Sequence, residues 1–185
     1  MSALRSRTRV VGRPGRDHER DVGAAWAVAS WVTDPELPMV TLADLGVLRD
    51  VRVEDDGTVV VEITPTYTGC PAMGVMRADL VHALRSAGFD SVDVRTVLSP
   101  AWSTDWITDD GRRKLAAGGI APPREAPERT SGPIPLQLSP RARSVECPLC
   151  GSPDTDQLSE FGATACKALR RCRSCREPFE HVKEI

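Results

Sequence analysis

The C-terminal part of the chain contains two Cys-x-x-Cys pairs, Cys147/Cys150 and Cys172/Cys175, in a segment with few large apolar side chains. Two residues between cysteines allow both sulfurs to reach one metal ion at about 2.3 Å, and two such pairs complete a tetrahedral site. Because so short a segment cannot bury enough apolar surface to fold alone, metal binding would supply the missing free energy of folding. We therefore expect residues 147–185 to form a four-cysteine metal ribbon, with a long hairpin arm between the pairs.

This pattern does not by itself identify the metal. One structural zinc ion is the simplest interpretation, and a rubredoxin-like iron or a metal that is passed onward are the alternatives. Four thiolates leave no open position for a catalytic water, which disfavours metal-dependent hydrolysis. Cys166, between the pairs, is interpreted either as a small buried apolar residue or as an exchangeable ligand or close neighbour of that metal. His181 is expected to be a surface residue and not a ligand.

Length, charge and cysteine content limit the function classes. With 185 residues the chain can hold one ordinary domain plus a small module. A net charge of −2 gives no general attraction to nucleic acid or an anionic membrane, and no apolar run approaches the roughly 20 residues that span a bilayer. Cysteines without a recognisable export signal favour metal or thiol chemistry over disulfides, and hence a reducing, cytoplasmic location.

The rest of the chain is expected to form an α+β domain over residues 19–120, between a disordered tail (1–18) and a proline-rich linker (121–146). Helical spacing of apolar residues, alternating strands and an Asp-Gly turn predict a small two-layer domain. Its order is helix, strand, strand, helix and strand, with a short extra helix. The expected ranges are 17–33, 47–54, 58–63, 73–87, 91–98 and 109–118.

Cys70, in the loop before the second long helix, indicates a different chemistry. Gly69 and Pro71 favour a turn that places Cys70 at the helix N-terminus, where backbone N–H groups are expected to lower the pKa of the thiol. No base is near in sequence unless the fold brings His82 close, and no Cys-x-x-Cys partner supports a thioredoxin-type cycle. Cys70 is then either a buried structural thiol or a single ligand for iron or an iron–sulfur species, held by one chain or shared across a homodimer.

Other conspicuous side chains have simpler interpretations. Trp102 and Trp106 are expected to pack the last segment of the domain onto its sheet. Four carboxylates near the first strand are expected to be solvated loop and cap residues: Asp34, Glu36, Asp44 and Asp50.

Three short motifs resemble the iron–sulfur cluster assembly domain family, to which SufT-like proteins belong. They are DPELP at residues 34–38, DLG at 44–46 and PTYTGCP at 65–71. The resemblance covers roughly residues 22–123. It implies a small α+β fold in which Cys70 is the functional residue.

Longer motifs, at residues 101–107, 119–123, 159–169 and 172–179, are similar to the PaaD (also PaaJ) family. Members of that family are accessory proteins encoded with the bacterial phenylacetyl-CoA epoxidase, a multicomponent di-iron monooxygenase. Ala163 stands where the family usually has serine, and the last three residues lack a cysteine often found there. The second departure argues against a fifth metal ligand and leaves the four-cysteine site intact. The resemblance implies a role in phenylacetate degradation and in maturation of the metal centres of the epoxidase.

Two hypotheses follow. In the first, the protein is not an enzyme but a maturation factor: Cys70 holds iron or an iron–sulfur cluster transiently, while the zinc ribbon docks onto the reductase or oxygenase component. In the second, it is a structural or regulatory subunit that binds the epoxidase without handling metal. Nucleic-acid binding through the ribbon arginines is disfavoured because the chain is acidic and the ribbon has few aromatic residues for stacking.

Overall fold

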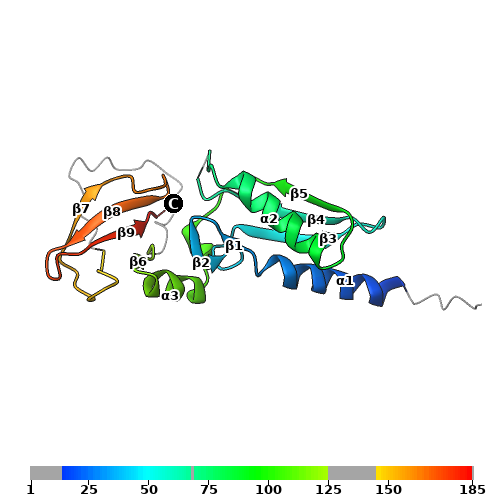
Figure 1. Cartoon of the computed structure of the whole chain (residues 1–185), viewed down its shortest axis with the longest axis horizontal. Coiled ribbons are helices and arrows are strands. Elements are labelled where there is room, and N and C mark those ends of the chain that lie inside the picture. The colour runs from blue at the N-terminus through cyan, green and yellow to red at the C-terminus, as the bar shows by residue number, and fades with distance from the viewer. Residues whose placement is uncertain (1–13, 68, 125–144, 185) are drawn as a thin grey trace, which may run out of the picture.

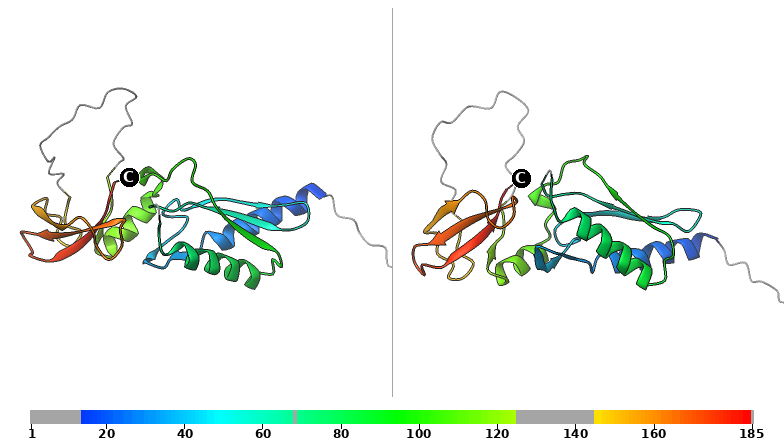
Figure 2. Two further views of the ribbon diagram at one scale, coloured as in Figure 1. Left: turned by 90° about the horizontal axis from the view of Figure 1, so that it is seen from above. Right: turned by 45° about the horizontal axis from the view of Figure 1, so that its top comes forward.

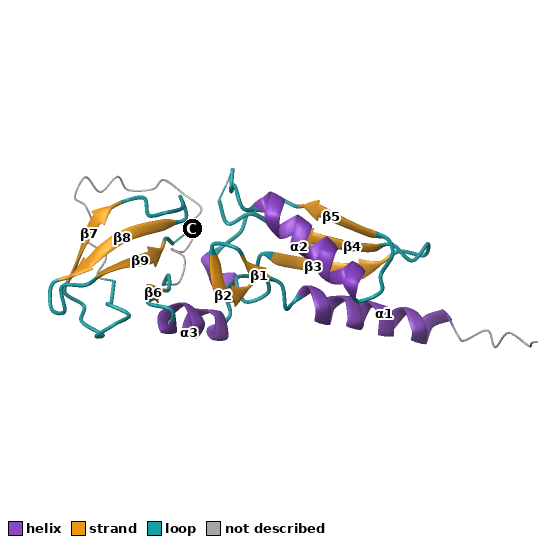
Figure 3. Cartoon of the chain, viewed as in Figure 1, coloured by secondary structure: helices purple, strands orange, loops and turns teal. Residues whose placement is uncertain are grey.

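The computed structural model describes residues 14–67, 69–124 and 145–184, which form an α+β domain followed by a smaller β module (Figures 1 and 3). In chain order the elements are α1 (Pro14–Ala29), β1 (Thr33–Asp34), β2 (Leu37–Thr41), β3 (Leu48–Val53), β4 (Val59–Ile63), α2 (Met73–Ser86), β5 (Val92–Thr96), a 3₁₀ turn (Thr104–Trp106), α3 (Asp109–Ala117), β6 (Ile120–Ala121), β7 (Thr155–Ser159), β8 (Lys167–Cys172) and β9 (Pro178–Val182). The predicted fold class, an α+β domain followed by a four-cysteine ribbon, is confirmed. Within the described ranges, none of the helices has the length and apolar character required to cross a membrane.

A three-stranded sheet in the order β3-β4-β5 forms the centre of the α+β domain. β3 and β4 are the antiparallel arms of the predicted hairpin, and α2 carries the chain across so that β5 runs parallel to β4. α1 and α2 cover one face of this sheet (Figure 2), where Val59, Val61 and Ile63 are fully buried. The opposite face carries charged side chains, among them the Arg52–Glu62 ion pair at 2.7 Å. The alternation along β4 therefore directs Val59, Val61 and Ile63 into the core under the helices, while Val60 on the opposite face is buried as well.

The first helix differs from its predicted bounds. It begins at Pro14, so residues 14–18 are helical and not part of a disordered tail, while residues 1–13 lie outside the described part of the chain. It ends at Ala29, because a turn closed by the Val32 N–H and the Ala29 carbonyl (3.2 Å) redirects the chain into β1. β1 and β2 were not predicted from the sequence, since the proline in β2 argues against a strand.

The second module is a four-stranded sheet in the order β6-β9-β8-β7. β7, β8 and β9 are antiparallel neighbours, and the β7–β8 hairpin is the long arm expected between the cysteine pairs. β6 was not expected in this sheet: it follows α3 and pairs in parallel with β9, Ile120 lying opposite Glu180. The ribbon therefore recruits residues 120–121, which the sequence suggested would end the domain and begin the linker. Residues 125–144 of that linker lie outside the described ranges.

The contact between the β6–β9 edge and the α+β domain, here called the seam, is apolar. Ile120 and Val182 belong to the same buried cluster as Leu37 and Leu45 of the first domain. The ribbon also has a small cluster of its own, consisting of Ala121, Val145, Cys147, Cys172 and Phe179. Because this second cluster is so small, we expect the ribbon to need the seam and a bound metal ion for its stability.

Candidate metal centre and thiol cavity

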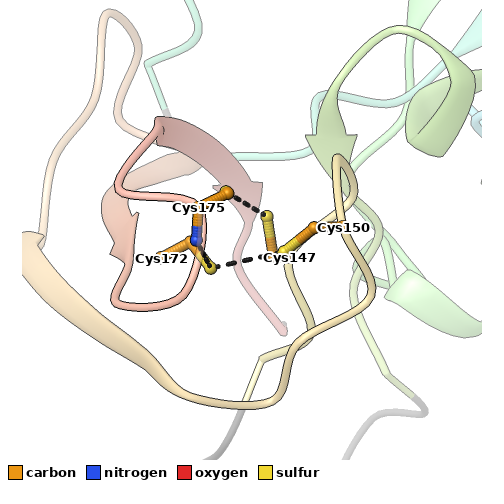
Figure 4. A group of neighbouring side chains, drawn as sticks. All are labelled: Cys147, Cys150, Cys172 and Cys175. Carbon is orange, nitrogen blue, oxygen red and sulfur yellow. Dashed lines mark hydrogen bonds between the residues drawn. The ribbon is translucent and has the colours of Figure 1, made fainter.

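The four cysteines of the two Cys-x-x-Cys pairs converge on one point (Figure 4). Their sulfur atoms all lie within 4.8 Å of one another, with 3.7 Å between Cys147 and Cys175 and 3.5 Å between Cys150 and Cys172. A tetrahedron with metal–sulfur bonds of about 2.3 Å has edges of about 3.8 Å. The donor set and its spacing therefore fit one tetrahedral metal ion bound by thiolates.

Each cysteine pair is positioned by a tight turn. In the first, the Gly151 N–H donates to the carbonyl of Cys147 (2.8 Å), and Gly151 has a φ of +72° that favours glycine. In the second, the Cys172 N–H donates to the carbonyl of Glu177 (3.0 Å) across the turn between β8 and β9. Local turns thus orient each pair, and the sheet brings the two pairs together.

Within this group, ionisation of one thiol opposes ionisation of its neighbours. The Cys175 N–H lies 3.5 Å from the Cys172 sulfur and lowers the pKa of Cys172 to about 6. The Glu177 N–H favours the Cys175 thiolate, but burial and the neighbouring sulfurs outweigh it and raise the pKa of Cys175 to about 12. A divalent cation would offset the repulsion among four thiolates, so the thiols that are still protonated lose their protons when it binds.

Cys70 and Cys166 line a different site, a cavity of about 80 Å³ at the seam. Its walls are mainly apolar and include Leu37, Trp102 and Val182. A cavity needs about 10–15 Å³ to hold one water molecule, so this one has room for a metal ion or a small inorganic cluster. Cys166 is therefore outside the four-sulfur group and faces the α+β domain.

Cys70 is held in a turn that depends on glycine. Gly69 has a φ of +87°, which other residues rarely adopt, and α2 begins at Met73, three residues beyond Cys70. The prediction of a lowered thiol pKa is wrong, because burial raises the pKa of Cys70 and the backbone N–H groups at the start of α2 do not offset it. Negative charge on Cys166 and Asp34 raises this pKa further.

Asp34 also lines the cavity, and its predicted role as a solvated loop residue is wrong because only 5% of its surface is exposed. Its Oδ1 accepts the N–H groups of Glu36 (2.8 Å) and Leu37 (3.0 Å) in the turn between β1 and β2. Burial raises the pKa of Asp34, while these two N–H groups and the charge of Lys167 act in the opposite direction. The DPELP motif was the sequence signal for this turn, but its spacing did not reveal the burial.

The other carboxylates and the tryptophans follow their predicted roles. Asp50 lies on the charged outer face of the sheet and Glu36 is exposed at the cavity. Asp44 accepts the N–H of Thr41 (2.9 Å) and so caps a turn. Trp102 is buried, and its indole N–H donates to the carbonyl of Leu45 (2.9 Å). Trp106 is half-buried, with the guanidinium of Arg49 3.7 Å from its ring centroid.

The two histidines considered in the sequence lie away from the Cys70 sulfur. His82 is exposed on α2, in a hollow that it shares with Trp31 and Asp79, so it does not activate the thiol. His181 is buried in β9 and not at the surface as predicted, and burial lowers its pKa. The chain therefore offers two thiols and two carboxylates at the cavity, and among the described residues no histidine lines it.

Two family models match the chain, one for each module. The iron–sulfur cluster assembly protein family matches residues 24–96, which contain Cys70 and the sheet of the α+β domain. The PaaD zinc beta ribbon domain matches residues 132–183, which contain the four clustered cysteines and Cys166.

Individual proteins match the chain either along most of its length or over less than half of it. The chain is 44% identical over 160 residues to a protein of Escherichia coli (strain K12) that is named as a putative subunit of 1,2-phenylacetyl-CoA epoxidase, with coverage of 86% of this chain and 91% of that protein. It is also 34% identical over 79 residues to the Fe-S protein maturation auxiliary factor SufT of Staphylococcus aureus (strain USA300). That match covers 42% of this chain and 88% of SufT. A crystal structure of a domain of unknown function, DUF59, from Bacillus anthracis superposes with a TM-score of 0.50 and 26% identity over 54% of this chain and 95% of that one.

Proposed function

This chain belongs to the PaaD family, in which an iron–sulfur assembly domain precedes a zinc ribbon, and from that premise we propose that it is a maturation factor of a phenylacetyl-CoA epoxidase. It assists the insertion of iron or an iron–sulfur cluster into the reductase or oxygenase component during phenylacetate degradation, and does not itself catalyse epoxidation. Cys70 holds this cargo briefly, while the four ribbon cysteines hold one structural zinc ion. The cytoplasm, where thiols stay reduced, suits this chemistry.

The environment of Cys70 is the observation that carries the proposal. Its thiol lines an apolar cavity large enough for an ion or a small cluster, in the domain that matches iron–sulfur assembly proteins. Soft thiolate ligands select iron–sulfur clusters over hard cations. Because the cavity offers fewer thiols than the four-sulfur group does, a bound cluster keeps positions at which a client can take over its ligation.

The test is the metal content of the epoxidase made in the presence of a Cys70→Ser variant. The epoxidase components are co-expressed with either form, purified, and analysed for iron and acid-labile sulfide. We expect components made with Cys70→Ser to lack most of this cargo, while the variant itself keeps its fold and zinc content. Tyr67→Phe is the matched control, since it alters another wall of the cavity and retains the sulfur. Full iron and sulfide content alongside Cys70→Ser would refute the proposal.

A second candidate function is a structural or regulatory role, in which the protein binds the epoxidase without handling metal. It is favoured by large apolar side chains exposed on the ribbon, Leu149 (55%), Leu158 (54%) and Phe161 (59%). Exposed side chains of this kind can mark a protein–protein contact when they are grouped. Gel filtration with the epoxidase components separates the candidates: a stable stoichiometric complex, with normal metal content in the presence of Cys70→Ser, supports the structural role.

A further inference from the structure

The loop between β7 and β8 fixes Cys166 at the seam. The Lys183 N–H donates to the carbonyl of Cys166 (2.9 Å), which ties its backbone to the residue after β9. The next residue, Lys167, is buried, and its Nζ lies 2.7 Å from Oε2 of Glu180. The other oxygen of Glu180 accepts the N–H of Ala163 (3.2 Å). β9 therefore holds both ends of this loop, and the position of Cys166 does not rely on ligation to the ribbon metal.

Two thiols and two carboxylates line the cavity: Cys70 from the loop before α2, Cys166 from the loop before β8, Asp34 from β1, and Glu36 from the turn after β1. They are close enough for charge on Cys166 and Asp34 to act on the Cys70 thiol. The two sulfurs in this apolar cavity are a pair of soft donors that suits iron, whereas among the described residues only the ribbon cysteines converge as a group of three or more ligating side chains.

We propose that Cys166 supplies a second thiolate to the cargo site, so that the iron is held between the α+β domain and the ribbon by one sulfur from each. When Fe²⁺ enters, the two thiols release two protons to solvent and form two Fe–S bonds, and no electron is transferred. The remaining coordination positions are open to ligands from the client. This inference rests on the proposed function and adds that the ribbon is half of the carrier site as well as a docking module.

Proximity of the two thiols can be tested without any metal in the cavity. Dibromobimane, which bridges two neighbouring thiols, is added to the full-length, zinc-loaded protein, and the bridged peptides are identified by mass spectrometry. We expect a Cys70–Cys166 bridge in the wild type, none in Cys70→Ser or Cys166→Ser, and an unchanged bridge in the control Ala165→Ser. The control adds a hydroxyl to the same loop and keeps both sulfurs. A wild-type protein with no such bridge would overturn the two-thiol site.

Iron binding then separates this inference from the proposed function. Fe²⁺ is titrated anaerobically into the zinc-loaded proteins, and zinc content confirms that each ribbon is intact. We expect Cys166→Ser to weaken binding by at least about tenfold, and Ala165→Ser to leave it unchanged. If Cys166→Ser binds Fe²⁺ with normal affinity while Cys70→Ser loses affinity, the second thiolate is refuted and Cys70 is left as a single-thiol carrier. Equal affinity in all variants, Cys70→Ser included, would refute the carrier function itself.

Discussion

Truncation of Val182 to alanine tests whether the ribbon packs on the α+β domain. Val182 is 5% exposed, belongs to the buried cluster of the first domain, and lines the thiol cavity. Loss of two methyl groups at about 0.8 kcal/mol each costs about 1.6 kcal/mol in transfer free energy, and the space left behind raises the total to about 2–3 kcal/mol. For a chain of this size the melting temperature should fall by about 4–12 °C.

The assay is urea and thermal unfolding of the zinc-loaded protein, followed by near-ultraviolet circular dichroism. Leu158→Ala is the matched control, because Leu158 is an apolar ribbon residue that is 54% exposed. Its unfolding free energy should stay within about 0.5 kcal/mol of the wild type. Equal values for Val182→Ala and Leu158→Ala would mean that β9 does not pack against the first domain, and the shared cavity would lose its physical basis.

Three further predictions concern the turn glycines, the Cys70 thiol and the ribbon metal. Gly69→Ala should lower the free energy of unfolding by about 1 kcal/mol, because φ is +87° but no atom would meet the new Cβ within 4 Å. Gly46→Ala should lower it by at least about 2 kcal/mol more, because its Cβ would lie 2.5 Å from that of Trp106. Equal unfolding free energies of the two variants in urea would contradict this reasoning. Iodoacetamide should modify Cys70 more slowly at pH 7 than it modifies a cysteine in an unstructured peptide, since the raised pKa leaves less thiolate at any given pH. Mass spectrometry should show the rate of modification rising above pH 9. A faster reaction of Cys70 than of the peptide at pH 7 would argue against burial of the thiol. Chelation of the ribbon metal should abolish hydrogen-exchange protection in β7–β9 while β4 and α2 stay protected, because the ribbon has too small a buried cluster to fold alone. Loss of protection in both modules, or in neither, would contradict this prediction.

Elements governed by local spacing were predictable. The apolar positions of α2 recur at helical spacing, and Met76, Leu80 and Leu84 are indeed buried. The Asp-Gly hairpin also has its predicted arms, because turn chemistry and strand alternation act over a few residues. The pKa of Cys70 was not predictable in this way, because the helix N-terminus is a local effect, whereas the burial that outweighs it comes from distant residues such as Trp102.

The amino-acid sequence by itself determined the four-cysteine group, since two residues between paired cysteines bring their sulfurs together through local turns. The sequence did not determine which residues lie beside Cys70 in the folded chain. Only the tertiary structure decided that Cys70, Cys166 and Asp34 share one cavity, and that β6 joins the ribbon. The physical reason is that the seam is closed by apolar packing between segments far apart in the chain, which no periodic pattern or short motif encodes.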